Sequence, residues 1–116
     1  MRAMHLVQQK QVEEFPLELV DLPVQEPGSG QVRVRVNVCG VCHTDLHTVE
    51  GDIKPAHLPI IPGHQVVGRI DAIGAGASHL EIGMRVGIPW FQSSCGTCQY
   101  CLSGIENLCP NAKFTG

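Results

Sequence analysis

Four cysteines near the end of the chain constrain its folding more than any other feature. They have the spacing Cys-x2-Cys-x2-Cys-x7-Cys, at Cys95, Cys98, Cys101 and Cys109. Four thiolates can surround Zn²⁺ as a tetrahedron and leave no place for water, so a site of this kind stabilises structure and performs no chemistry. Two disulfides or an iron–sulfur cluster are the alternatives, although the spacing differs from the usual ferredoxin run. We predict a structural zinc lobe over residues 92–112.

The composition indicates a single globular domain. Of the 116 residues, 43% are hydrophobic and 16% are charged, which is typical of a chain that can bury a modest core. There are 13 glycines and 8 prolines, which favours short strands joined by turns. A net charge of −3 without a basic block argues against a nucleic-acid partner. No apolar run approaches the roughly 18 residues of a membrane span.

The cellular compartment is predicted from the N-terminus and the cysteines together. The first ten residues contain neither an apolar signal region nor a cleavage pattern for secretion. Six cysteines in a chain without such a signal favour metal binding over disulfides. We therefore expect a reduced, cytoplasmic protein.

Alternating residues predict the clearest strand. Val32, Val34, Val36 and Val38 alternate with polar residues, the pattern of a half-buried strand with one wet face. Further strands are expected over residues 2–7, 17–22, 65–73 and 84–89, a short helix over 44–49 and an irregular loop over 52–62. Successive strands with little helix indicate a small, mainly β barrel.

A second group of possible metal ligands follows that strand directly. The stretch Cys39–His47 contains two thiols and two imidazoles, and Pro62-Gly63-His64-Gln65 follows the irregular loop. Thiolate with imidazole is a ligand set that zinc prefers. However, Cys39-x2-Cys42-His43 also matches the c-type haem attachment pattern, and the two cysteines could form a thioredoxin-like redox pair. A structural Cys42 and a hydrogen-bonded His64 are a further possibility, and these residues alone leave the choice open.

Residues 40–47, the Pro62-Gly63-His64 segment and the four-cysteine lobe together resemble the zinc-dependent medium-chain alcohol dehydrogenases. The resemblance runs through the whole chain and preserves both the order and the spacing of the segments. It implies a GroES-like catalytic domain, which is a mainly β, partly open β-barrel with short helices and a four-cysteine zinc lobe.

The resemblance implies a catalytic zinc site. Cys42 and His64 correspond to two of its three protein ligands, and the third, usually a cysteine, would lie beyond the last residue. Asp45 corresponds to the carboxylate that orients the zinc-bound histidine. Gln65 stands where the family usually has a glutamate behind the metal, so the site would be less negative here. Cys39 is not a ligand in this pattern, and we expect it to be a small core residue.

The resemblance also implies roles in substrate and cofactor handling. Thr44 corresponds to the hydroxyl that contacts the alkoxide, and His47 to the imidazole that passes its proton to solvent through the cofactor ribose. His43 corresponds to a residue that contacts the cofactor pyrophosphate. Ile53 and Trp90 fall where the family lines its substrate pocket.

The implied activity is the reversible oxidation of an alcohol to an aldehyde or ketone by NAD or NADP, with zinc in both sites. No Gly-x-Gly-x-x-Gly pattern follows a predicted strand. We therefore expect residues 1–116 to be the N-terminal part of the catalytic domain, without the Rossmann domain and inactive alone. Exposed strand edges would favour a homo-oligomer. The alternative is a stand-alone zinc-binding or scaffold module on the same fold.

Overall fold

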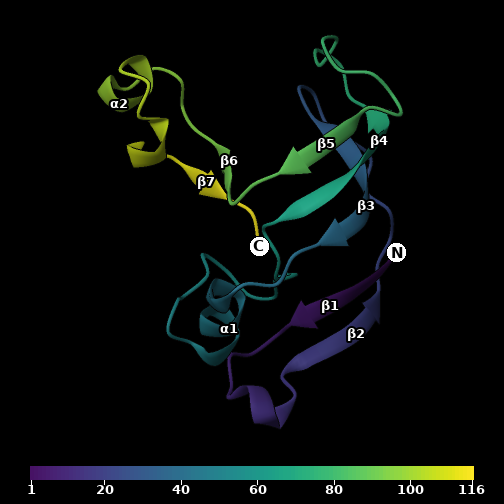
Figure 1. Ribbon diagram of the computed structural model, residues 1–116, viewed down its shortest axis with the longest axis vertical. Coiled ribbons are helices and arrows are strands. Elements are labelled where there is room, and N and C mark those ends of the chain that lie inside the picture. Colours follow the sequence, from purple (N-terminus) through teal and green to yellow (C-terminus); the bar gives the residue numbers. More distant parts are fainter.

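The computed structural model describes residues 1–116 and contains three separate antiparallel sheets (Figure 1). The strands are β1 (Arg2–Leu6), β2 (Leu17–Asp21), β3 (Val32–Cys39), β4 (Val66–Ile73), β5 (Arg85–Ile88), β6 (Phe91–Ser93) and β7 (Lys113–Phe114). The helical segments are α1 (His43–Glu50), α2 (Gln99–Leu102) and the 3-10 turns η1 (Val12–Glu14) and η2 (Glu106–Leu108). The predicted mainly β fold is confirmed, but its sheets stay open and form no closed barrel.

The largest sheet has the strand order β3-β4-β5. The predicted strand at residues 32–38 is therefore present, but the prediction that its valines are half-buried throughout is wrong. Val36 and Val38 are 55% and 58% exposed. Residues 35–39 of β3 are exposed on both faces of the strand, so no other element covers this half of it. The strand lies at the edge of the sheet, and its pairing with β4 is interrupted twice, between Arg33 and Val34 and between Val36 and Val38. Alternation alone does not reveal whether another element covers a strand.

A small core joins the first sheet to α1. Leu6 at the end of β1, Val49 in α1 and Ile60 in the following loop are buried against one another, with Leu17 packed beside them. Leu6 and Ile60 also exchange backbone hydrogen bonds of 2.8 and 3.1 Å. These contacts hold the loop after α1 against the β1–β2 pair, although the loop has little regular structure of its own.

The beginning of α1 is determined by the residues that follow β3. The backbone N–H of Cys42, the residue before the helix, donates to Oδ2 of Asp45 at 2.8 Å, which satisfies one of the free donors of a helix start. The helix ends at Gly51, whose φ of 101° is readily adopted only by glycine. The short helix expected over 44–49 is therefore confirmed.

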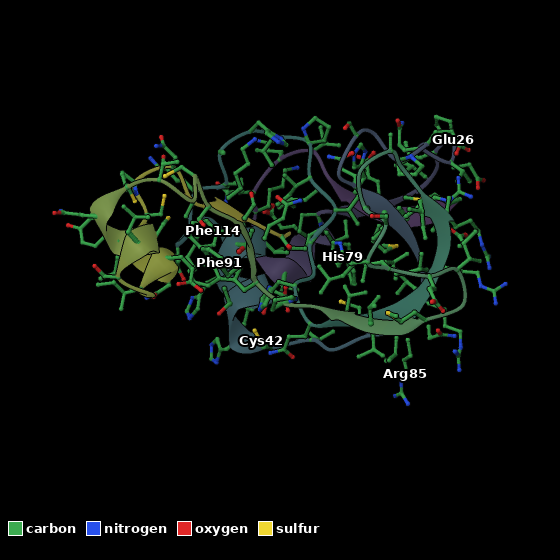
Figure 2. The ribbon with its side chains drawn as sticks, turned by 90° about the horizontal axis from the view of Figure 1, so that it is seen from above. Glu26, Cys42, His79, Arg85, Phe91 and Phe114 are labelled. Carbon is green, nitrogen blue, oxygen red and sulfur yellow. The ribbon has the colours of Figure 1, made fainter.

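Aromatic contacts connect the cysteine lobe to the rest of the chain. Phe91 and Phe114 lie where the lobe meets the other sheets (Figure 2). Trp90 stacks on Phe114 with ring centroids 4.3 Å apart, and Phe91 meets the edge of Phe114 at 6.2 Å. These contacts hold β6 and β7 against each other and against Trp90. No helix in the structure has both the length and the apolar character needed to cross a membrane.

Candidate metal centres and active-site pocket

The four cysteines of the lobe converge on one point. The Sγ atoms of Cys95, Cys98, Cys101 and Cys109 all lie within 4.8 Å of one another. The Sγ of Cys101 is 3.9 Å from that of Cys95 and 3.5 Å from that of Cys98. Four sulfurs around Zn²⁺ at ~2.3 Å would be about 3.8 Å apart, so the thiol arrangement fits a tetrahedral zinc ion. All six cysteines are free thiols, and the two disulfides considered above are absent.

Local hydrogen bonds give these thiols different acidities. The backbone and hydroxyl of Thr97, together with the Cys98 N–H, lower the pKa of the Cys95 thiol to about 5. The pKa of Cys101 is also lowered, first by Ser94. For Cys98, the backbone N–H of Cys101 lowers the pKa of the thiol. Burial and the neighbouring thiols outweigh this effect and raise the pKa to about 11. The lobe thus favours at least one thiolate at neutral pH. The thiolate is the form of cysteine that binds metal.

A second group lies at the start of α1. The Sγ of Cys42 is 3.1 Å from Nε2 of His64, a little less than the about 3.6 Å expected for sulfur and nitrogen on one tetrahedral zinc. Nδ1 of His64 lies 3.2 Å from Oδ1 of Asp45. His64 is buried, only 8% exposed. Its ring therefore directs one nitrogen to a carboxylate and the other to a thiol, as zinc-binding histidines commonly do.

Asp45 positions both members of this pair. One of its carboxylate oxygens faces the His64 ring and the other accepts the N–H of Cys42. The same side chain thus caps the helix and fixes the imidazole orientation. This donor set fits a zinc ion held by Cys42 and His64, with Asp45 behind the histidine.

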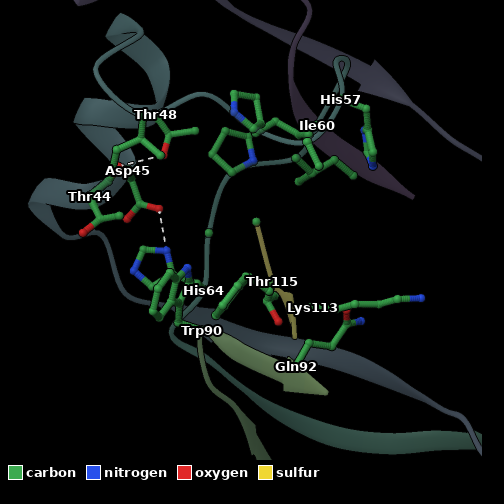
Figure 3. A pocket seen from close by; sticks show the side chains of 18 of the residues that line it. Thr44, Asp45, Thr48, His57, Ile60, His64, Trp90, Gln92, Lys113 and Thr115 are labelled. Carbon is green, nitrogen blue, oxygen red and sulfur yellow. Dashed lines mark hydrogen bonds and ion pairs between the residues drawn. The ribbon is translucent and has the colours of Figure 1, made fainter. Parts of the chain in front are cut away.

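His64 of this pair, together with Asp45, lines a pocket of about 790 Å³, within the range of small-molecule sites. Cys42 lies behind His64 and is not part of the lining. Five residues singled out by the sequence line it, namely Thr44, Asp45, Ile53, His64 and Trp90. They come from α1, the irregular loop, the segment before β4 and the segment before β6. Figure 3 shows Thr44, Asp45, His64 and Trp90 along one side of this pocket.

Two histidines of α1 lie outside the pocket lining. His43 and His47 stack on each other with ring centroids 4.7 Å apart, as expected for residues four apart on one helical face. Nδ1 of His47 lies 2.7 Å from Oδ2 of Asp52. This contact orients the His47 ring and leaves its Nε2 without a hydrogen-bond partner.

Cys39 and Gln65 are both exposed to solvent. Cys39 was expected in the core, and this prediction is wrong because the residue ends an edge strand and is exposed. Its sulfur instead faces Gly63, where an added Cβ would lie 2.8 Å away. Gln65 is also exposed, and its side chain lies against Gly40.

Several residues that sequence patterns did not indicate also line the pocket: His5, Thr48, Lys54, His57, Gln92 and Lys113. The spacing of Thr44 and Thr48, four residues apart on a helix, could have identified Thr48. Lys54 and His57 come from a loop, and Gln92 and Lys113 from strands of three and two residues, which carry no periodic signal. His5 comes from the five-residue strand β1.

Comparison with known proteins identifies the family of the chain. Residues 28–116 match the model of the alcohol dehydrogenase GroES-like domain. An alcohol dehydrogenase of Geobacillus stearothermophilus is 50% identical over 109 residues, covering 90% of this chain and 32% of the relative. The crystal structure of an NAD-dependent alcohol dehydrogenase superposes with a TM-score of 0.87 at 37% identity, over 98% of this chain and 33% of the other.

A cobalt- and zinc-bound thermostable alcohol dehydrogenase from Pyrobaculum aerophilum also superposes, with a TM-score of 0.87 at 28% identity over 100% of this chain and 36% of the other. This chain thus spans about a third of the length of the relatives that it matches. The family model covers well over half of the 116 residues, including both cysteine-containing clusters. The chain belongs to the alcohol dehydrogenase GroES-like domain family.

Proposed function

We propose that this chain forms the zinc- and alcohol-binding part of an alcohol dehydrogenase that uses NAD or NADP. The observation that carries the proposal is the Cys42–His64 pair, with sulfur and nitrogen 3.1 Å apart and with His64 in the pocket lining. A thiol and an imidazole, held by Asp45 and facing one point, are suited to a catalytic zinc that keeps a position open for substrate. The lobe cysteines would hold a second, structural zinc ion.

The residues around the pocket have distinct roles in this mechanism. Bound zinc would supply Lewis-acid chemistry, which lowers the pKa of an alcohol hydroxyl. The Thr44 hydroxyl would accept the alcohol proton at the pocket wall and release its own proton toward His47. His47 passes the proton on toward solvent, with Nδ1 held by Asp52 and Nε2 available. Ile53 and Trp90 hold the carbon chain of the alcohol and exclude water from it.

The nicotinamide cofactor would be held mainly by a Rossmann domain that residues 1–116 do not contain. The lack of a Gly-x-Gly-x-x-Gly pattern after any strand supports this assignment. His43, exposed at the first turn of α1, would contact the cofactor pyrophosphate. The free thiols fit a reducing, cytoplasmic location.

Zinc-dependent alcohol oxidation by the complete polypeptide tests the proposal. We expect nicotinamide reduction with primary or secondary alcohols, loss of this activity when a chelator removes zinc, and its return when zinc is added. The Cys39→Ser variant should behave like the unmodified protein because Cys39 binds no metal in this scheme. Alcohol oxidation that survives complete zinc removal would refute the proposal.

Replacing Asp45 with Asn should weaken zinc binding at the Cys42–His64 site by about 10- to 100-fold. An amide can still accept the Cys42 N–H, but it lacks the charge that makes His64 a stronger ligand. The measurement is a competition between the complete polypeptide and a zinc chelator. Asp52→Asn is the matched control, because Asp52 contacts His47 and no proposed ligand. Equal zinc affinities for the two variants would show that Asp45 does not support the metal site.

A further inference from the structure

We infer that the pocket selects alcohols and aldehydes that carry an anionic group, such as a carboxylate, at the end distant from Cys42 and His64. This inference rests on the proposed function, because it assigns the substrate class of the same pocket. It follows from the charges of the lining residues and from their positions relative to the metal ligands.

The charge of the lining is opposite to the charge of the chain. The whole sequence has 11 acidic and 8 basic residues. The pocket lining contains two lysines, Lys54 and Lys113, and three histidines, but only one carboxylate, Asp45. That carboxylate is already engaged by the Cys42 N–H and by His64. The pocket therefore has positive charge and no free negative group to repel an anion.

The two lysines are available to a ligand. Neither Lys54 nor Lys113 forms an ion pair in the structure, whereas Arg33 pairs with Glu26 and Asp71. Both lysines are exposed, so each ammonium group can reorient toward an anion at little cost. His57 adds a ring N–H donor, which can bind a carboxylate oxygen even when the ring is neutral.

The position of these groups determines which end of the ligand they would contact. Figure 3 shows Lys113, Gln92 and His57 on the side of the pocket away from Thr44 and Asp45. Lys113 and Gln92 are carried by β7 and β6, and His57 by the loop after α1. A ligand whose hydroxyl lies near His64 would thus direct its other end toward Lys113 and His57.

The pocket lining also contains apolar side chains. Ile53, Ile60, Trp90 and Phe114 line the pocket, and the Trp90 and Phe114 rings stack on each other. A ligand that fits this lining has a hydroxyl or carbonyl at one end, a short hydrocarbon chain and an anionic group at the other. An ω-hydroxycarboxylate has this arrangement.

Fluorescence of Trp90 provides a direct binding assay, because Trp90 is the single tryptophan of the chain and lines the pocket. The zinc-loaded complete polypeptide is titrated with ω-hydroxyhexanoate, the diol of equal length and the amino alcohol of equal length. Where the polypeptide contains further tryptophans, they are first replaced by phenylalanine. We expect the hydroxyacid to bind about three- to tenfold more tightly than the diol, and the amino alcohol more weakly than the diol. The advantage should shrink as salt is added, because the lysines are exposed and screened.

One variant identifies the responsible group. Lys113→Gln should reduce hydroxyacid affinity by about two- to fivefold and leave diol affinity unchanged. Lys10→Gln is the matched control, since Lys10 is exposed and does not line the pocket. Equal affinities for hydroxyacid and diol, or an equal loss for both ligands in Lys113→Gln, would overturn the inference.

The relative affinities of the three ligands are measured without turnover. Their outcome is therefore separate from that of the test of the proposed function. Zinc-dependent alcohol oxidation without a preference for the hydroxyacid would refute the anionic-substrate inference alone. A preference for the hydroxyacid in a protein that oxidises no alcohol would refute the proposed reaction alone.

Discussion

Cys95→Ser is expected to abolish zinc binding by the lobe and to unfold residues 92–112. Between β6 and β7 the lobe has only two single turns of helix, and of its cysteines only Cys109 is buried. It therefore lacks an apolar core large enough to hold its fold without metal. Structural zinc in small domains contributes about 10–16 kcal/mol of apparent binding free energy, and this free energy is also folding free energy. Losing one thiolate of four removes most of that contribution.

Zinc content distinguishes the two clusters in the 116-residue chain. Cys42 and His64 provide only two ligands, and a two-ligand site holds zinc weakly. We therefore expect close to one zinc ion per chain in the unmodified protein and in Cys42→Ser, and almost none in Cys95→Ser. Cys39→Ser controls for the loss of an exposed thiol. Zinc loss in Cys42→Ser with zinc retained in Cys95→Ser would contradict the assignment of the structural site.

Gly68→Ala is expected to destabilise the protein by about 3 kcal/mol. Gly68 is buried in β4, directly opposite β3. A Cβ at this position would lie 2.4 Å from the carbonyl oxygen of Arg35 and 2.6 Å from Cγ1 of Val34. The oxygen belongs to the backbone of a paired strand, so it cannot move without disturbing the sheet.

Gly87→Ala is the matched control on the neighbouring strand. Gly87 lies in β5, and its nearest atom to an added Cβ would be the Val66 oxygen at 3.8 Å, an ordinary contact distance. We expect this variant to stay within about 1 kcal/mol of the unmodified protein, because alanine also restricts the unfolded chain. Denaturant unfolding curves of both variants measure the difference. Similar midpoints for the two would show that β3 and β4 can separate at Gly68 without cost.

Local sequence patterns were sufficient to predict most of the strands and helix α1. Alternating valines predicted β3, and a Gly- and Pro-rich composition predicted a mainly β chain with short elements. The helix after β3 was predicted within one residue at each end, and the structure shows why: the Asp45 side chain caps Cys42, and Gly51 ends the helix. The spacing of the four cysteines likewise predicted that they would converge. In each case the determining residues lie close together in the sequence, so a local sequence pattern is enough to predict how they are arranged.

The pocket and the exposure of each strand depended on the tertiary structure. Cys42 and His64 are 22 positions apart, and Lys113 reaches the same pocket from β7. No local pattern relates these residues, because their proximity results from the packing of the loop after α1 against Leu6 and from the stacking of Trp90 on Phe114. Val36 and Cys39 are exposed because no other element covers the second half of β3. Alternation determines on which face of a strand a side chain lies, but only the arrangement of the other elements determines whether that face is covered.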